Sequence, residues 1–234
     1  MNGPGLLALQ LVDIDLDHVA SQERRLPERA ALDAAQSAHR NWRADRARFA
    51  AVVDEATASI TRSEQESASI DVKRSRLEQQ LKTIIAPREA EALMHEIDTL
   101  RANRSALDDA ELEAMEVQSE AEASILALDE QEPALVATVT SAQADLDAAL
   151  ATLAATREEL TARRAAAIEA LDAADVATYD ALRARFAGVG VVRLDGRRCT
   201  GCHLDLSAGE VDVVKSAPAD VLPECPHCGR LIVR

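Results

Sequence analysis

A heptad repeat of apolar residues constrains most of this chain. Spacings of four and three residues alternate through residues 42–84 and again through residues 93–160, mostly at apolar positions with polar ones in the middle of the first run. A 3.5-residue repeat held over this length is typical of a coiled-coil seam. No glycine occurs between residues 5 and 188, so about 180 residues lack the commonest turn residue. The pattern favours long helices over a compact globular core.

The two heptad runs meet at Ile85-Ala86-Pro87-Arg88-Glu89. Proline restrains the residue before it from helix and suits the first turn of the next helix. The flanking segments are nearly equal, about 80 and about 85 residues long, so an intramolecular antiparallel hairpin with its turn near residues 85–88 is expected. Pairing with a second copy stays open, since a seam does not specify intramolecular closure.

Two further prolines are expected to kink or break the helices, namely Pro27 and Pro133. A separate apolar seam from Leu9 to Leu26 does not share the phase of the run that begins at Trp42, so the register slips near Pro27. Charged residues also occupy seam positions, and we interpret them as register control or solvated groups rather than catalytic residues. They are Arg46, Arg74, Arg104, Glu111 and Glu132.

All four cysteines lie in the last 36 residues, as Cys199-Thr-Gly-Cys202 and Cys225-Pro-His-Cys228. Two such pairs complete the tetrahedral thiolate set that Zn²⁺ prefers. Four protein ligands close the coordination sphere, whereas catalytic zinc keeps a position open. The spacing therefore predicts one structural zinc ion.

Other roles for the cysteine region are less favoured. Disulfides are disfavoured because the chain is acidic, shows no signal peptide and is larger than small secreted scaffolds. His203 and His227 could replace or orient a cysteine, but we favour surface positions for both. A thioredoxin-like redox motif is remote, because no βαβ pattern surrounds either pair.

Short strands are expected around the cysteines. Residues 188–196 form a β-branched run closed by an Asp-Gly turn, a hairpin signal, with Leu204-Asp205-Leu206 as a returning strand and Leu231-Ile232-Val233 as the last one. Ser207 and Glu210 predict a capping box for a short helix. So few apolar residues require the metal for stability.

The expected fold is therefore mainly α. A long antiparallel coiled-coil hairpin covers residues 1–180, and a small β-rich zinc ribbon covers residues 181–234. This order resembles the bacterial family of coiled-coil proteins with a C-terminal C4-type zinc ribbon. The most specific parts of the resemblance are the segment 87–97 and the ending Cys225-Pro226-His227-Cys228-Gly229-Arg230. The resemblance covers the whole chain and implies the zinc role for the four cysteines. Members are described as non-enzymatic, and some are linked to an alternative sigma factor, transport components or messenger RNA binding.

Charge divides the chain in the same way. From residue 181 onward there are eight basic and six acidic residues, a net charge of +2, while the remainder has 18 minus 35, or −17. An arm this acidic repels phosphate backbones and suits basic protein partners or simply solubility, as a solvated helix surface with no dedicated partner. Our first hypothesis is a non-enzymatic adaptor that binds protein partners along the hairpin, in transcription or its regulation.

The second hypothesis is RNA or DNA binding through a basic face of the ribbon. Two observations weaken it: zinc with four thiolates is formally −2, and no aromatic residue follows Phe186 to stack on bases. The candidate residues for this face are Arg193, Arg197, Arg198, Arg230 and Arg234.

An enzyme is disfavoured and no catalytic residue is predicted. The chain has no glycine-rich phosphate loop, no nucleophile elbow and no open metal site. No apolar run approaches the ~18 residues that span a bilayer, and aspartates interrupt the only apolar stretch near the N-terminus. We expect a cytoplasmic protein that does not bind membranes, and its oligomeric state is left open.

Overall fold

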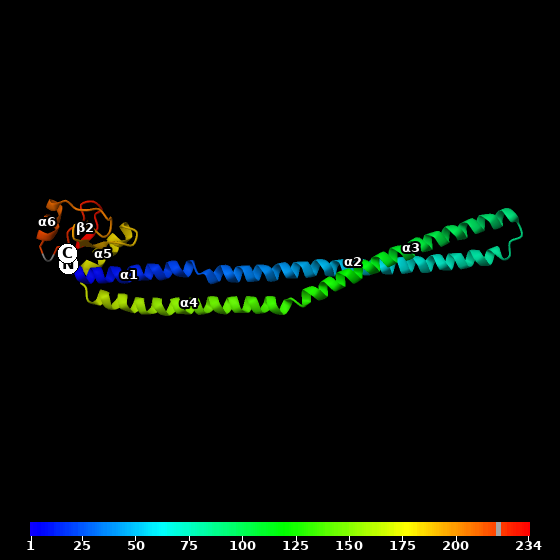
Figure 1. The fold of residues 1–234 in the computed structure, drawn as a ribbon, viewed down its shortest axis with the longest axis horizontal. Coiled ribbons are helices and arrows are strands. Elements are labelled where there is room, and N and C mark those ends of the chain that lie inside the picture. The colour runs from blue at the N-terminus through cyan, green and yellow to red at the C-terminus, as the bar shows by residue number, and fades with distance from the viewer. Residues whose placement is uncertain (219–220) are drawn as a thin grey trace. The chain divides into compact units, whose positions relative to one another are not determined.

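The computed structural model describes residues 1–218 and 221–234, most of them helical (Figure 1). The elements in chain order are α1 (Gly3–Arg24), α2 (Pro27–Leu81), α3 (Pro87–Asp129), α4 (Glu132–Glu169), α5 (Ala173–Arg185), β1 (Val191–Asp195), β2 (Arg198–Cys199), α6 (Ala208–Ser216) and β3 (Leu231–Val233). The predicted fold class, long helical hairpins with a small C-terminal strand region, is confirmed. Within the described residues, no helix is long and apolar enough to cross a membrane. The expected cytoplasmic location stays a prediction.

The chain forms two compact units. The ribbon unit comprises residues 1–31 and 143–234, and the hairpin unit comprises residues 32–142. The predicted domain boundary at residue 180 falls inside α5, within the ribbon unit, and stays a prediction.

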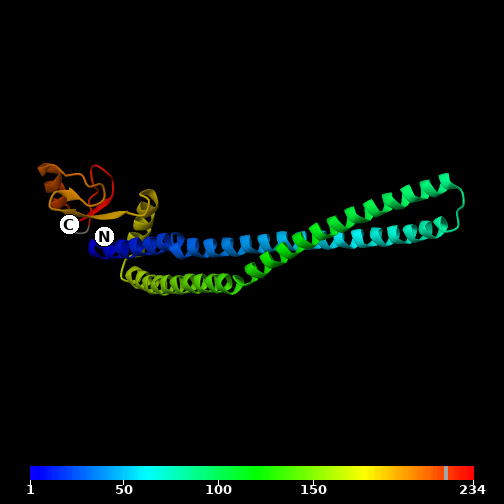
Figure 2. The same cartoon turned by 45° about the vertical axis from the view of Figure 1, so that its right-hand side comes forward.

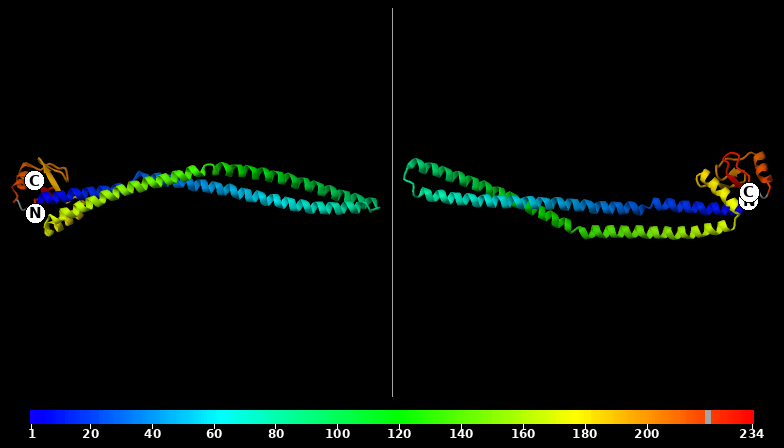
Figure 3. Two further views of the ribbon diagram at one scale, coloured as in Figure 1. Left: turned by 90° about the horizontal axis from the view of Figure 1, so that it is seen from below. Right: turned by 180° about the vertical axis from the view of Figure 1, so that it is seen from behind.

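In the hairpin unit, α2 and α3 lie side by side and are joined by the short loop 82–86 (Figures 2 and 3). Ala86 is extended, with φ −78° and ψ 119°, as expected for a residue that precedes proline. The positions buried in this unit follow the predicted heptads. They are Trp42, Ala56, Ser63 and Ser67 on α2, Ile97 and Ala121 on α3, and Ala35, one heptad before Trp42.

Both predicted proline breaks are present. One helix ends at Arg24 and the next begins at Pro27, while α3 ends at Asp129 and α4 begins at Glu132, directly before Pro133. Proline has no N–H to continue the preceding helix, so each new helix starts at or beside it.

The ribbon unit contains a three-stranded sheet in the order β2-β1-β3, with β1 antiparallel to β2 and parallel to β3. Asp195 pairs with Arg198 across a two-residue turn. Gly196, the first residue of that turn, has φ 59°, the position where a type II′ turn requires glycine.

One strand prediction was wrong. The returning strand is Arg198–Cys199 rather than Leu204-Asp205-Leu206, from which only Asp205 pairs, in an isolated bridge to Arg198. The tight Asp-Gly turn brings the chain back at once, so the residues directly after it take the place beside β1. The last strand and the Ser207–Glu210 capping box are confirmed.

The two faces of the sheet pack into two different cores. Val191, Leu231 and Val233 face a cluster that includes Leu6 and Leu9 of α1 and Tyr179 of α5. On the other face, Val192 and Ile232 pack with two of the cysteines and with α6. Helix α1 therefore supplies apolar surface that the ribbon's own sequence lacks.

Candidate metal centre

The four cysteines converge from two turns of the ribbon. Their sulfur atoms all lie within 4.8 Å of one another, with Cys199 Sγ 4.0 Å from Cys228 Sγ and Cys202 Sγ 3.9 Å from Cys225 Sγ. A tetrahedral zinc ion with Zn–S bonds of about 2.3 Å requires sulfur separations of about 3.8 Å. The arrangement therefore fits one structural zinc ion, as predicted, with all four coordination positions held by protein thiolates.

The two cysteine turns share one backbone conformation. In the first, His203 N–H donates to the Cys199 carbonyl at 2.9 Å, and in the second, Gly229 N–H donates to the Cys225 carbonyl at 2.8 Å. The residue after the second cysteine is left-handed in both turns, with φ 60° at His203 and 71° at Gly229. Each turn thus directs two sulfur atoms to one point.

The local environment acts on the thiols in opposite directions. Burial raises the pKa of the Cys225 thiol to about 12. Burial also acts to raise the pKa of Cys228, but hydrogen bonds from the Arg230 backbone and side chain, with those from the neighbouring thiols, lower it to about 7. Metal binding must displace a proton from each thiol, and the Cys228 thiol gives up its proton more readily than the Cys225 thiol.

The two histidines lie outside the sulfur cluster. The group of described residues close enough to share a metal consists of the four cysteines alone. His203 is exposed, and His227 Nε2 lies 3.8 Å from Glu210 Oε2. These positions agree with the surface interpretation.

Four of the five candidate arginines brace the ribbon. Arg197 Nε donates to the Leu206 carbonyl at 3.0 Å, and Arg198 Nε donates to the His203 carbonyl at 2.9 Å. Arg230 and Arg234 also donate to backbone carbonyls. Arg230 Nε donates to the Val189 carbonyl at 2.8 Å, and Arg234 donates to the carbonyls of Lys215, Ala217 and Pro218.

The fifth arginine, Arg193, is exposed on β1. Its guanidinium makes no hydrogen bond or ion pair with the described residues. A nucleic-acid role for the five arginines stays a prediction.

Sequence reasoning missed a buried polar junction between α1 and the rest of the ribbon unit. Gln10 is 1% exposed; its Nε2 donates to the Gly188 carbonyl at 2.7 Å, and its Oε1 accepts from Gly190 N–H at 2.7 Å. This side chain fixes the backbone at the entry to β1.

Asp13 lies one helical turn further along the same face of α1 and is also 1% exposed. Its carboxylate accepts hydrogen bonds from Tyr179 Oη at 2.6 Å and Arg164 Nε at 2.7 Å, and Arg183 Nε lies 3.4 Å away. Burial and the bond to Asp13 raise the pKa of Tyr179 well above its usual value. The i, i+3, i+4, i+7 spacing of Leu6, Leu9, Gln10 and Asp13 is the sequence signal that would have indicated this face.

Comparison with known proteins agrees with this architecture. Residues 9–187 match the model of a CT398-like coiled coil hairpin domain, and residues 198–232 match that of a C4-type zinc ribbon domain. The chain is 30% identical to an uncharacterised protein of Mycobacterium tuberculosis over 231 residues, which cover 98% of this chain and 94% of the relative.

Solved structures show the same fold. A Mycobacterium smegmatis protein is 28% identical, with a TM-score of 0.83, and the match covers 99% of this chain and 97% of that one. CT398 from Chlamydia trachomatis is 22% identical, with a TM-score of 0.78 and coverage of 98% and 95%, and shows the fold alone.

Proposed function

Because this chain belongs to the CT398-like family of coiled-coil hairpin proteins with a C4-type zinc ribbon, we propose that it is a non-enzymatic adaptor whose hairpin unit binds protein partners. The zinc site supports the non-enzymatic part, since four thiolates leave no position for water or substrate. A role in transcription or its regulation stays a prediction.

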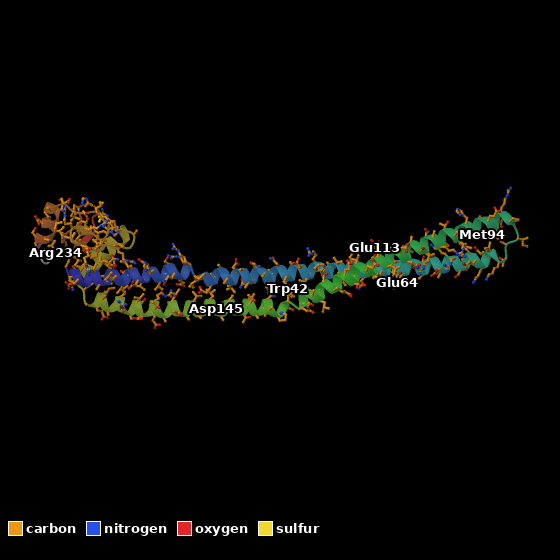
Figure 4. The ribbon with its side chains drawn as sticks, viewed as in Figure 1. Trp42, Glu64, Met94, Glu113, Asp145 and Arg234 are labelled. Atoms are coloured by element: carbon orange, nitrogen blue, oxygen red, sulfur yellow. The ribbon has the colours of Figure 1, made fainter. Side chains whose placement is uncertain are left out.

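The observation that carries the proposal is the surface of α3. The segment 105–142 contains no lysine or arginine, and Figure 4 labels one of its acidic side chains, Glu113. Its acidic residues are Asp108, Asp109, Glu111, Glu113, Glu116, Glu120, Glu122, Asp129, Glu130 and Glu132. Two of these are paired with arginines within the hairpin unit, Asp108 with Arg104 and Asp129 with Arg46.

Exposed apolar side chains lie among these carboxylates. Leu112 is 60% exposed, Met115 50% and Leu126 66%. Their spacing continues the four–three alternation one residue beyond the seam, so they share a stripe on one side of α3 that α2 does not cover. An exposed apolar stripe bordered by acidic groups fits a partner helix whose polar face is basic.

The test is capture of partners from cell extract on zinc-loaded, full-length protein. Leu112→Gln combined with Met115→Gln should remove the captured proteins while helix content stays unchanged. The matched control is Val72→Gln, which removes a side chain that is 71% exposed on α2. Equal capture by the double variant and the wild type would refute the assignment to α3.

The full chain is needed for this test. Leu6 and Leu9 pack against strand residues of the ribbon. A protein truncated at residue 180 would expose these two leucines, and the exposed apolar surface would bind proteins nonspecifically.

Nucleic-acid binding by the ribbon is the second candidate. The structure offers one favourable observation: Arg185 and Arg230 both stack on the Phe186 ring, each 5.1 Å from its centre, so an aromatic residue does lie beside the ribbon. The test is fluorescence anisotropy of the zinc-loaded protein with labelled RNA and duplex DNA across a salt series. Binding whose logarithm falls linearly with log salt would support phosphate contacts.

Arg193→Gln is the informative variant for this second candidate, because Arg197 and Arg198 brace the first cysteine turn and their replacement would disturb it. Arg163→Gln, an exposed arginine on α4, serves as the control. If neither RNA nor DNA binds at low salt, the result would favour the adaptor function over nucleic-acid binding.

A further inference from the structure

We propose that a groove between α1 and the zinc ribbon binds an acidic peptide segment of a partner protein that carries bulky apolar side chains. This α1–ribbon groove has a volume of about 450 Å³ and lies wholly within the ribbon unit. Its lining includes Leu7, Leu11 and Ile14 from α1, Val189 before β1, Arg193 on β1, and Arg230 after the second cysteine turn.

The floor of the groove is an apolar face of α1 that is only partly used in the folded core: Leu7 is partly buried against the cluster of Leu6 and Leu9, whereas Leu11 and Ile14 belong to neither core. Leu7, Leu11 and Ile14 follow a four–three spacing, which places them on one side of the helix. Leu11 is 53% exposed. The face that carries Leu6 and Leu9 is already buried against the sheet, so packing of this core accounts for Leu7 in part but not for Leu11 and Ile14. Concave apolar surface with a few polar groups at its edge is typical of ligand sites.

The charge of the groove is opposite to that of the chain. Overall the chain has 41 acidic and 26 basic residues, yet among the described residues the groove is lined by two arginines and a histidine and by no carboxylate. The guanidinium of Arg193 is exposed and makes no hydrogen bond or ion pair with the described residues. Arg230 is held in place by the hydrogen bond from Nε to the Val189 carbonyl, by stacking on Phe186 and by its side-chain hydrogen bond to the Cys228 thiol.

Two carboxylates of α1 near the ribbon are engaged elsewhere, and the exposed Asp15 does not line the groove. Asp13 accepts from Tyr179 and Arg164, and Asp17 accepts from Arg183 at 2.8 Å. The groove thus presents guanidinium donors beside an apolar floor. Carboxylates are their natural partners, because an arginine binds a carboxylate through two parallel N–H donors.

The floor selects a peptide over a nucleic acid. No phenylalanine, tyrosine or tryptophan lines the groove, and the ring that does line it is the imidazole of His203. A phosphate backbone has no apolar group to bury against Leu7, Leu11 and Ile14. A peptide with leucine or isoleucine next to glutamate or aspartate satisfies both the floor and the rim.

The experiment measures binding of short fluorescein-labelled peptides to the zinc-loaded, full-length protein by anisotropy. The probe has glutamates and leucines on opposite faces of a helix. Two comparison peptides replace its glutamates with lysine or its leucines with glycine. We expect saturable binding of the glutamate–leucine peptide only. Leu11→Gln and Arg193→Gln should each weaken it by about tenfold or more, as expected for residues at the centre of an interface.

Two control variants test whether any loss of peptide binding is specific to the groove. Val213→Gln removes an apolar side chain that is 67% exposed on α6, and Arg163→Gln removes an exposed guanidinium on α4. Both should bind the peptide as the wild type does, and zinc content and helix content should be equal in all variants. The α3 double variant, Leu112→Gln with Met115→Gln, should also bind normally, so failure of the adaptor proposal would be seen separately.

Several results would overturn the assignment. They are no peptide binding at low salt, equal binding of the glutamate–glycine peptide, or equal losses in the control variants. RNA binding that is lost with Arg193→Gln and retained with Leu11→Gln would identify a phosphate site instead. If sedimentation shows a dimer that Leu11→Gln dissociates, the occupant of the groove is a second copy of this chain.

Discussion

The residues that follow Cys202 and Cys228 occupy equivalent places but differ in chemistry. Both have positive φ, 60° at His203 and 71° at Gly229. A left-handed conformation costs a residue with a Cβ roughly 1–2 kcal/mol, and glycine avoids this cost. A Cβ at position 229 would also come within 3.3 Å of Phe186 Cζ. The second turn is therefore relaxed at this position, and the first carries a conformational cost.

We expect opposite effects from substitutions at these two positions. Gly229→Ala should destabilise the zinc-loaded ribbon by about 1–2 kcal/mol, and His203→Gly should stabilise it by up to about 1 kcal/mol. Both are measured as the urea concentration at which a colorimetric chelator detects released zinc. Gly209→Ala is the control, because no atom lies within 4 Å of a Cβ added there and its φ is ordinary. A loss of stability in His203→Gly would contradict the argument.

The sequence predicts the cysteines and misses the polar junction for one physical reason. The metal ligands are identified by spacing within a few residues, because a CxxC turn positions two sulfur atoms locally. The hydrogen-bond partners of the junction are distant in sequence: Asp13 accepts from Tyr179, 166 positions away, and Gln10 accepts from Gly190, 180 positions away. In the sequence, the spacing of Leu6, Leu9, Gln10 and Asp13 indicates a shared helix face, but it does not indicate that the charge of Asp13 is buried there. Its burial depends on tertiary contacts that no local pattern contains.

At the scale of elements, the sequence predicts which residues form the seam between α2 and α3. It does not predict whether the polar groups buried in that seam are hydrogen-bonded. The heptads correctly predict which positions face the partner helix, including Ser63 and Ser67, because periodicity alone decides the face. Whether a seam serine finds a partner depends on the opposing side chain. Ser67 is 3% exposed, and its Oγ makes no hydrogen bond with the described residues.

Ser67→Ala should therefore stabilise the hairpin unit. The change removes a buried hydroxyl that lacks a hydrogen bond and adds helix propensity, together about 1 kcal/mol or more. Trp42, the only tryptophan, lies in the same unit, so its fluorescence during urea unfolding reports the effect. Ser75→Ala, at an exposed position of α2, measures propensity alone. Equal gains from the two substitutions would show that burial of the hydroxyl contributes nothing.

An ion pair beside Trp42 predicts how the hairpin unit responds to acid. The Arg46 guanidinium donates to both Asp129 oxygens, at 2.6 and 3.1 Å, and this hydrogen bonding lowers the pKa of Asp129. A carboxyl whose pKa is lowered in the folded state contributes stability that is fully present above its ordinary pKa and is lost as the pH falls from that value through the lower pKa of the folded state.

Wild-type protein should be more stable than Arg46→Gln at neutral pH, and the difference should vanish as the pH falls from about 5 to about 2. The measurement is urea unfolding by Trp42 fluorescence at several pH values. Arg62→Gln, which removes an exposed pair with Glu55, provides the comparison. A difference that persists in acid would mean that packing of the Arg46 side chain, rather than its charge, is responsible.

At the scale of the whole molecule, the two compact units depend on the metal to different extents. The ribbon's cysteine-side core joins Val192, Ile232 and the ligands Cys199 and Cys225, so its packing is built on the metal centre. The hairpin unit holds no cysteine, and its buried positions come only from its own helices. The ribbon sequence indicates this dependence, because it has too few apolar residues to form a core alone. What it does not indicate is the second core that α1 supplies.

Removal of zinc with a strong chelator should unfold the ribbon and leave the hairpin unit folded. The four thiols should become reactive, and hydrogen exchange should quicken at β1, β3 and α6, while the far-UV helix signal changes little. The reason is that α6 has 9 residues, whereas α2 and α3 have 55 and 43. Trp42 fluorescence should stay constant throughout. If α1 loses protection from hydrogen exchange together with the ribbon, the packing of α1 on the sheet depends on the metal. A fall in the far-UV helix signal of α2 and α3 would contradict the prediction, because it would show that zinc stabilises the whole chain as one cooperative unit.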